Sequence, residues 1–562
     1  MMRIKLKIIE KKGHSQIIKF FLLLLVMMSL VSCGSNAPGS IYRQLRAPQI
    51  QNPGSPNPDS NLGDPELPDF RGIVRSASGA VNQVGPSSIS NSDQLVSVTN
   101  IMGQVVFNNA EKLYYTYLSQ SDTASDFYEN NLVSYDFSDT PVVTYNVSVS
   151  NFYRTESYTR LYPPLSPIIG HNGHLYTVVR QTQSDLEDLS HTGEGRDLYG
   201  HAVIKSFEDL GTSFNLRWSC DQLNADVLSD PYIDGDNRIW VLTNSGTSQE
   251  LVVLTDGEAL GISNCAVLGR AAVDLPSNYH LGLRLPPTVE SEIAYIPSKT
   301  SDFGFVRAYD TSVSPQWSFY NGLESGDLNS DFFNEGQGDA DITVNNQRFF
   351  MVEPGVSYNT IDSLTVSGVS VDDTYVYVVF VRRFENASPF FPDYRSKLIV
   401  LNKSTGAYVS STAIDTTNPR SGNGFSFSTG LVVRETSSGT RQLYFGLKNS
   451  LGNGSFFSYE FDGTGFTKVL EETINSGDFF TSNYIFSQSP VIDSSGTVYM
   501  SVTSTEENKA KVFYMDTSNN IVEQDFNDLP GSRSSFVSLK YDLRIYDGAV
   551  YIVSPYGLYK VN

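Results

Sequence analysis

The chain has 562 residues, of which 40% are hydrophobic and 18% are charged, and its formal net charge at pH 7 is −22. A nucleic-acid-binding protein needs a positive surface, so this charge argues against a nucleic-acid partner and is read here as a source of solubility. The length exceeds what one ordinary hydrophobic core supports, which predicts several domains or a repeat architecture.

The first residues of the chain have the pattern of an export signal. Basic residues precede the apolar run FFLLLLVMMSLV at positions 20–31, which is too short to span a membrane. The run ends in LVSC, and this tetrapeptide resembles the lipobox of bacterial lipoproteins. The resemblance implies a signal peptide over residues 1–32 and a Cys33 that carries diacylglycerol and palmitate-type acyl groups. The alternative is an ordinary secretory signal in which the cysteine is incidental.

Residues 33–92 follow as an acylated cysteine and a segment dense in Pro, Gly, Ser and Asn. Such a composition cannot bury a core and predicts a flexible tether between the lipid and a folded domain. Among bacterial lipoproteins an Asp directly after the cysteine is the usual inner-membrane retention signal, and here that residue is Gly34. We therefore expect a lipid-anchored protein of the bacterial cell envelope, in the outer membrane, facing either the periplasm or the exterior.

Residues 93–562 repeat a pattern of four short apolar runs separated by turn signals, most clearly in residues 487–526. These runs are rich in β-branched and aromatic residues and are too short for helices, so they predict strands. The first hairpin of the pattern occurs eight times, and the second occurs only seven times. Each first hairpin is centred on one aromatic residue of its second strand: Tyr115, Tyr176, Trp240, Tyr295, Tyr377, Tyr444, Tyr499 and Tyr551.

This repetition predicts an all-β fold, an eight-bladed β-propeller of four-stranded antiparallel blades. A single four-stranded sheet cannot bury both faces, and radial packing of the repeats solves that problem. The eighth repeat ends at the chain terminus without its fourth strand. Residues 93–100, which include Leu95, Val96 and Val98, have the length and alternation to supply that strand and close the ring.

Three segments carry a family resemblance: SPVIDSSGTVYMSV at 489–502, AYDTSVSPQWSF at 308–319 and LNKSTGAYVSS at 401–411. They resemble the repeat of pyrroloquinoline-quinone-type propellers, with Trp218 and Trp317 at the closing-tryptophan position and Thr405 and Gly406 in the Thr-Gly position. A lipobox followed by such a propeller is similar in layout to the propeller lipoproteins of the outer-membrane β-barrel assembly machinery. The resemblance implies a scaffold or assembly role with a protein or envelope partner.

The insertions predict where a partner binds. The turns inside the hairpins are short, whereas the opposite face of the propeller receives long segments, including residues 119–130, 181–200, 321–355 and 382–396. The last of these holds the candidate partner-binding residues, since aromatic and Arg side chains dominate interface hot spots. These residues are Arg382, Arg383, Phe390, Phe391, Tyr394 and Arg395. The alternative is an aromatic loop that packs on its own blade.

If Cys220 and Cys265 occupy equivalent outer strands of the second and third repeats, they lie in neighbouring blades, and we expect a disulfide, with two free thiols as the alternative. Asp327, Asn329 and Asp331 imitate the start of a calcium loop, but the positions that need Gly and Glu do not match, and we expect no metal site.

No catalytic constellation emerges from the sequence, and we expect a noncatalytic, monomeric propeller with no cofactor. Many quinoprotein dehydrogenases of the family have adjacent cysteines, which this chain lacks. Two other functions stay open: a cell-surface carbohydrate-binding or adhesive module, and a degenerate quinoprotein-like enzyme. Glycan binding would indicate the first, and quinone or calcium in the purified protein the second.

Overall fold

The structure is a computed structural model of the chain. The chain divides into two units, residues 1–60 and 61–562, and every described residue belongs to the second. The structure describes residues 84–87, 92–97, 102–108, 112–120, 127–136, 142–153, 166–180, 202–223, 225–244, 248–257, 261–262, 264–273, 275, 287–299, 304–319, 341–344, 347–351, 358–366, 369–386, 393–414, 425–428, 430–436, 438–449, 454–474, 484–486, 490–504, 509–516, 520–526, 543–554 and 557–562.

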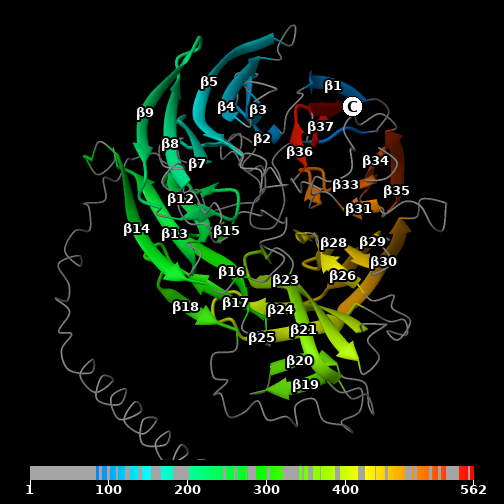
Figure 1. Ribbon diagram of the computed structural model, residues 1–562. Helices are drawn as coiled ribbons and strands as arrows, with labels where there is room; N and C mark the ends of the chain where they lie inside the picture. The colour runs from blue at the N-terminus through cyan, green and yellow to red at the C-terminus, as the bar shows by residue number, and fades with distance from the viewer. Residues whose placement is uncertain are drawn as a thin grey trace, which may run out of the picture. The chain divides into compact units, whose positions relative to one another are not determined.

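Eight antiparallel sheets follow one another in a ring, which confirms the predicted eight-bladed β-propeller (Figure 1). We number the blades in chain order and call the strands of each blade first to fourth from the centre outwards. Blade 1 is β2 (Met102–Phe107), β3 (Lys112–Gln120), β4 (Phe127–Asp136) and β5 (Val142–Tyr153). Blade 2 is β6 (Ile168–Ile169), β7 (Leu175–Arg180), β8 (Ala202–Asp209) and β9 (Phe214–Cys220). Blade 4 is β15 (Thr288–Glu290), β16 (Ile293–Lys299), β17 (Gly304–Tyr309) and β18 (Pro315–Ser318).

In blades 3, 5, 6 and 7 the first strand is interrupted, so two separate pieces pair with the second strand. Blade 3 is β10 (Asp226–Val227) and β11 (Tyr232–Ile233), then β12 (Arg238–Asn244), β13 (Gln249–Asp256) and β14 (Cys265–Ala272). Blade 5 is β21 (Tyr358–Val366) and β22 (Ser370–Val371), then β23 (Tyr375–Asn386), β24 (Asp393–Asn402) and β25 (Tyr408–Ala413). Blade 6 is β26 (Phe425–Ser428) and β27 (Val432–Glu435), then β28 (Arg441–Asn449), β29 (Gly454–Phe461) and β30 (Phe466–Ile474). Blade 7 is β31 (Tyr484–Phe486) and β32 (Val491–Ile492), then β33 (Val498–Ser504), β34 (Lys509–Met515) and β35 (Ile521–Phe526).

Blade 8 joins the two ends of the propeller. Its strands are β36 (Arg544–Tyr546), β37 (Ala549–Ser554), β38 (Gly557–Val561) and β1 (Ser92–Ser97). The outermost strand β1 pairs antiparallel with β38, from Ser92 opposite Val561 to Ser97 opposite Gly557. Leu95 lies in a bulge of this ladder and packs against the core of blade 1. The prediction of a ring closed by an N-terminal strand is therefore confirmed, with the strand beginning one residue earlier than expected.

Each second strand buries one aromatic side chain against the next blade, but in blade 1 the predicted residue is wrong. Tyr114 is the residue that packs against blade 2, whereas Tyr115 packs against blade 8. Adjacent residues of a strand point to opposite faces, so with two consecutive tyrosines the turn decides which one matches the repeat. In blade 1 the turn ends at Lys112, and Tyr114 is two residues further on. In blade 3 the turn ends at Arg238, and Trp240 is likewise two residues further on.

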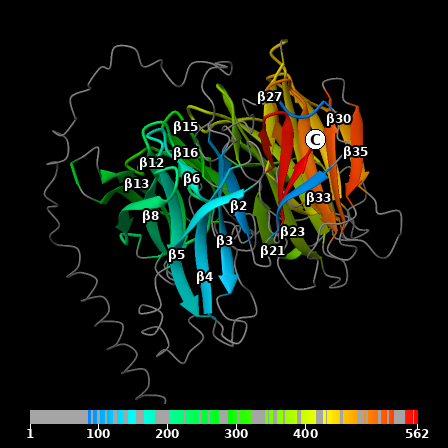
Figure 2. The same ribbon diagram turned by 90° about the horizontal axis from the view of Figure 1, so that it is seen from above.

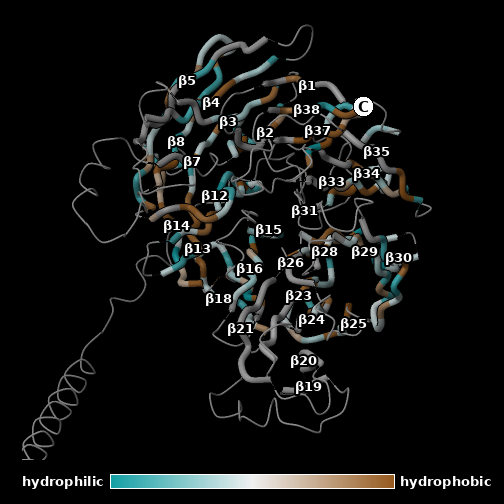
Figure 3. Tube along the Cα trace, turned by 45° about the vertical axis from the view of Figure 1, so that its right-hand side comes forward, coloured by the Kyte–Doolittle hydropathy of each residue, from teal (hydrophilic) through white to brown (hydrophobic). Residues whose placement is uncertain are grey.

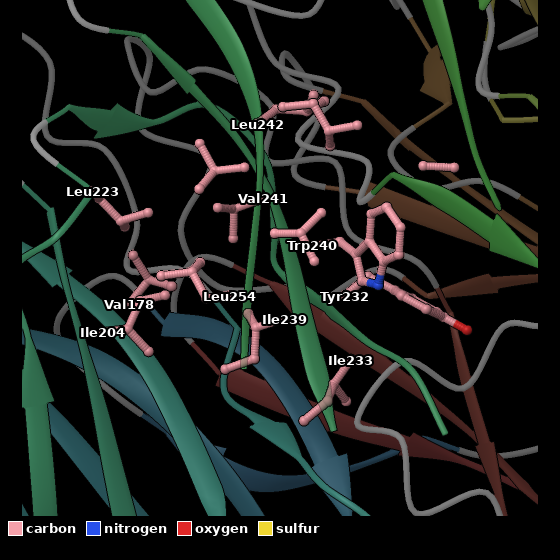
Figure 4. Close-up of a cluster of buried hydrophobic side chains, with 14 of the residues drawn as sticks. Val178, Ile204, Leu223, Tyr232, Ile233, Ile239, Trp240, Val241, Leu242 and Leu254 are labelled. Atoms are coloured by element: carbon pink, nitrogen blue, oxygen red, sulfur yellow. The ribbon is translucent and has the colours of Figure 1, made fainter. Parts of the chain in front are cut away.

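The core lies between the blades rather than inside them. Figure 3 shows hydrophobic residues along the strands of adjacent blades. Figure 4 shows Val178 and Ile204 of blade 2 close to Ile239 and Leu254 of blade 3, and all four are buried. Burial of apolar area between sheets is the main favourable term in such a fold, so each blade depends on its neighbours.

Residues 84–87, which lie in the predicted tether, contact blade 7. The Gly85 N–H donates to Asp493 Oδ2 at 2.9 Å, and the Tyr499 hydroxyl donates to the Pro86 carbonyl at 3.0 Å. The Tyr499 ring leaves no room for a Cβ at position 85, so glycine is required there. The chain is thus held against the ring before β1 begins.

A pair of strands outside the blades lies in the predicted insertion between blades 4 and 5. β19 (Asp341–Val344) and β20 (Gln347–Met351) form an antiparallel hairpin, and β20 lies beside the outer strand β25. The part of the chain that the structure describes contains no helix with the length and hydropathy to cross a bilayer.

Candidate partner-binding face

The two faces of the ring differ in their connections. The turns between first and second strands and between third and fourth strands open on one face, which we call the turn face. The connections between second and third strands and between blades open on the other, which we call the loop face. The long insertions predicted from the sequence belong to connections of the loop face, which makes it the candidate binding surface.

Asp256, at the end of β13, is an acceptor of the turn face that bonds to a neighbouring blade. Its carboxylate accepts hydrogen bonds from three groups of blade 2: the Tyr176 hydroxyl at 3.0 Å, Arg217 Nη1 at 2.6 Å and Trp218 Nε1 at 3.1 Å. Asp256 is only 4% exposed, so these bonds form where water competes weakly. The carboxylate therefore joins blade 3 to both the second and the fourth strand of blade 2.

The other closing tryptophan makes the same kind of contact. Trp317 in the fourth strand of blade 4 donates its indole N–H to the Lys403 carbonyl of blade 5 at 2.8 Å. Gly406 has a positive φ of 67° and lies against the Trp317 ring with no room for a Cβ. The two residues of the family-like motif, Trp317 and Gly406, thus meet across one blade boundary.

Buried tyrosine hydroxyls complete this network. Tyr377 donates to Asp372 Oδ2 at 2.7 Å, and Arg441 of blade 6 donates to the same oxygen at 3.1 Å. Burial raises the pKa of Tyr377 far above its usual value, and the Asp372 charge raises it further. The hydroxyl therefore stays protonated at physiological pH and acts as a donor, a structural role rather than an acid–base role.

Replacing Asp256 with Ala is expected to lower the free energy of unfolding by about 3 kcal/mol, because it leaves the Arg217 charge without its buried carboxylate partner. Chemical denaturation followed by tryptophan fluorescence measures this effect. Asp462→Ala is the matched control, since Asp462 bonds only within its own exposed turn in blade 6, and its loss should be clearly smaller. Equal losses in the two variants would show that Asp256 does not join the blades.

Cys220 and Cys265 form a disulfide between the fourth strands of blades 2 and 3, with their Cα atoms 5.7 Å apart. The sequence left two free thiols as the alternative. The bond crosses the boundary that Asp256 also spans, so the second and third blades are tied near the rim.

The loop face is dominated by blade 5. From Tyr377, β23 continues nine residues to Asn386, whereas β7, β12 and β16 continue four residues beyond their aromatic residues. At the usual rise per residue the difference corresponds to about 16 Å. β21 and β24 pair along this extension, so it is a sheet of three strands. The segment predicted as a loop is therefore largely strand, because β21 pairs with β23, and β23 with β24, along the extension.

The register of this projecting sheet brings four of the predicted partner-binding residues together. Arg382 is opposite Arg395, and Arg383 is opposite Tyr394. Phe390 and Phe391 lie outside the described residues, as does Cys33.

The projecting sheet continues from strands that lie in the core of the ring. Val378 packs against blade 4, and Val379 packs against blade 6. The extension beyond them carries the two predicted pairs, which are adjacent in the ladder.

Blade 1 is also lengthened towards the loop face. β3 reaches Gln120, which pairs with Tyr128, and β4 and β5 continue to the pair Phe127 and Tyr153. The strands β3, β4 and β5 lie side by side in both ribbon views (Figures 1 and 2). Blades 1 and 5 are opposite each other in a ring of eight, so the loop face has two separate extensions.

Metal ligands are not gathered in the described ranges, where no group of three or more His, Cys, Asp or Glu side chains could hold an ion. The calcium-like positions Asp327, Asn329 and Asp331 lie outside those ranges.

No protein-family model matches the chain, and no curated protein matches it. Several solved structures do. The periplasmic gluconolactonase of Pseudomonas aeruginosa is 12% identical with a TM-score of 0.33, covering 74% of this chain and 96% of its own. The complex of Drosophila Plexin A with Semaphorin 1b matches at 10% identity and a TM-score of 0.34, covering 85% and 88%. The β-propeller domain of the Trilobed protease from Pyrococcus furiosus matches at 11% identity and a TM-score of 0.32, covering 77% and 98%. At these scores the likenesses carry no conclusion about activity, ligand or partner.

Proposed function

We propose that this protein is a noncatalytic lipoprotein of the bacterial outer membrane, anchored through Cys33, whose propeller binds a protein partner on its loop face. The observation that carries the proposal is the projecting sheet of β21, β23 and β24, with Arg382 opposite Arg395 and Arg383 opposite Tyr394. Binding residues are commonly mounted on extensions of a rigid scaffold, and Arg and Tyr are typical interface anchors.

Two further observations support export and a scaffold role. The Cys220–Cys265 disulfide is typical of proteins that fold outside the reducing cytosol. The contact of Trp317 with blade 5 supports the resemblance to the pyrroloquinoline-quinone-type repeat, in which a closing tryptophan joins blades. In this proposal the aromatic and carboxylate residues of the turn face hold the ring, and the loop face performs the binding.

Site-specific photo-cross-linking in cells tests the binding face. A photoreactive amino acid at position 394 should form a cross-link to one envelope protein, and the matched control at Leu210 should not. Leu210 is 55% exposed and lies in a turn of the opposite face. Arg382→Gln combined with Arg395→Gln should reduce the cross-link at least fivefold while leaving the melting temperature near that of the parent.

Palmitate labelling of the same cells tests the anchor, because Cys33→Ala should abolish the label and release the protein from membranes. Continued labelling would contradict lipidation at Cys33. Cross-links of equal yield at positions 394 and 210, or a cross-link that soluble glycans suppress, would contradict a protein partner on the loop face.

A further inference from the structure

β5 is the fourth strand of blade 1 and has an open edge. β5 has twelve residues, Val142–Tyr153, and it pairs with β4 from one end to the other. This ladder contains two bulges. On its other side no strand of the described residues pairs with it. An unpaired edge presents a row of backbone N–H and C=O groups that can accept another strand.

The sequence of β5, VVTYNVSVSNFY, contains no charged residue and no proline. Charges and prolines are the usual means by which proteins prevent an edge strand from pairing with other chains. β5 lacks both, and its alternating valines and aromatic residues have high strand propensity. Its length corresponds to about 40 Å of open edge.

The other outer strands are shorter, and most of them carry these protective residues: Arg217 in β9, Arg270 in β14, Pro315 in β18, Lys468, Glu471 and Glu472 in β30, Glu523 and Asp525 in β35, and Asp93 in β1. β25 is also uncharged, but it has only six residues and β20 lies beside it. Among the described strands, length and absence of charge therefore coincide only in β5.

We propose that β5 is a strand-addition site, which binds an extended, uncharged segment of a partner protein as a fifth strand of blade 1. The inference rests on the proposed function, because it names how the partner is held. The end of β5, where Asn151 and Tyr153 pair with Glu129 and Phe127, lies at the loop face. A strand added there would be continuous with the proposed binding face.

Charge decides the class of segment. A charged peptide side chain beside β5 would find no opposite charge on the strand, and the chain's net charge of −22 repels acidic peptides in particular. An uncharged segment rich in β-branched residues has no charge left without a partner, and it forms the backbone hydrogen bonds of the ladder. Strand addition takes its affinity from main-chain hydrogen bonds and its specificity from alternate side chains.

The experiment uses the whole mature protein and a synthetic peptide with the sequence of residues 143–152, VTYNVSVSNF, with a fluorophore and an uncharged Gly-Ser pair at each end for solubility. Fluorescence anisotropy should show saturable binding of this peptide. The same peptide N-methylated at every other backbone nitrogen should bind at least tenfold more weakly. N-methylation removes the donors but keeps the side chains, so the difference reports a backbone ladder. Equal binding of the two peptides, or no binding of either, would overturn the proposal.

Asn146 has an exposed side chain in β5, so Asn146→Lys combined with Ser148→Lys adds the missing edge charges. This variant should bind the unmodified peptide at least fivefold more weakly. Leu268→Lys, at a 41% exposed position of the outer strand β14, is the matched control and should bind like the parent. Thermal unfolding of all three proteins shows whether the fold is kept, and the N-methyl comparison on the parent protein remains decisive if it is not.

Sedimentation equilibrium of the parent protein separates the two possible occupants of the edge. A monomer in the absence of peptide supports a partner segment, whereas a dimer that the peptide dissociates would replace the partner with a second copy of this chain and overturn the proposal. If the position 394 cross-link fails but the peptide still binds, the proposed binding face is wrong and the strand-addition site stands. If the cross-link forms but the peptide does not bind, the strand-addition site is wrong and the binding face stands.

Discussion

Deletion of Ser92–Ser97 is expected to lower the free energy of unfolding by on the order of 5 kcal/mol and to cause aggregation. Five residue pairs join β1 to β38, and each backbone hydrogen bond contributes about 1 kcal/mol net. The deletion also removes Leu95 from the core of blade 1 and the Leu95 carbonyl that accepts the Tyr135 hydroxyl at 3.1 Å. β38 would become an exposed edge. Chemical denaturation and light scattering measure both effects.

The matched control is an equal-length deletion within residues 51–69, in the segment predicted as a tether. It shortens the chain by the same amount but removes no predicted strand, so it should leave both measurements unchanged. If the two deletions behave alike, β1 does not close the ring in solution.

Replacement of both Cys220 and Cys265 with Ser is expected to lower the free energy of unfolding by about 4 kcal/mol. The two cysteines are separated by 45 residues, and a cross-link over a loop of this size reduces the entropy of the unfolded chain by that amount in the chain-entropy description. Both sulfur atoms belong to residues at most 3% exposed, so the serine hydroxyls add a smaller cost of burying polar groups.

Double Ala replacement is the control for that polar cost, and reduction of the parent protein by dithiothreitol under denaturing conditions is the control for the bond itself. All three preparations should share the same loss within about 1 kcal/mol. A parent protein whose stability does not change on reduction would show that the two thiols are not bonded, and thiol titration of the unreduced protein would then find two free thiols.

The sequence predicts the ring because the pattern that carries it is local and repeated. Each turn, each alternation of apolar residues and each central aromatic such as Trp240 or Tyr377 is visible within about twenty residues. A count of the hairpins was enough to predict that the last repeat lacks its fourth strand. These features are redundant, so the misassignment of Tyr115 for Tyr114 in one blade did not change the fold.

The candidate site was harder to predict because its features depend on pairing between distant segments. The extension of β23 to Asn386 exists because β21, from the connection between blades, lies beside it. A single run such as RRFENASPFFPDYRS gives no sign of that partner and resembles a loop. The placement of Arg382 opposite Arg395 also follows from register, which composition does not contain.

The carboxylates that bond to groups beyond their own turns were missed for a different reason. Asp256, Asp372 and Asp493 all follow apolar runs and precede turns, a position that turn chemistry alone explains. Their second oxygens bond to groups of the same hairpin, of a neighbouring blade or, at Gly85, of the segment before β1. Asp372 and Asp493 occupy the same place in their repeats, between the first and second strands, and this recurrence was the available signal for those two.

The pairing of β1 with β38 also sets the order in which the molecule can fold. Ser97 and its partner Gly557 are 460 residues apart, so the first strand to be synthesised must wait for the last. Closing a loop of this length is entropically costly, and contacts of high sequence separation form slowly. The seven blades between them have local hairpins that can form earlier. An exported chain would therefore carry β1 as an unpaired strand until its final residues arrive, and this interval is when it most needs a chaperone.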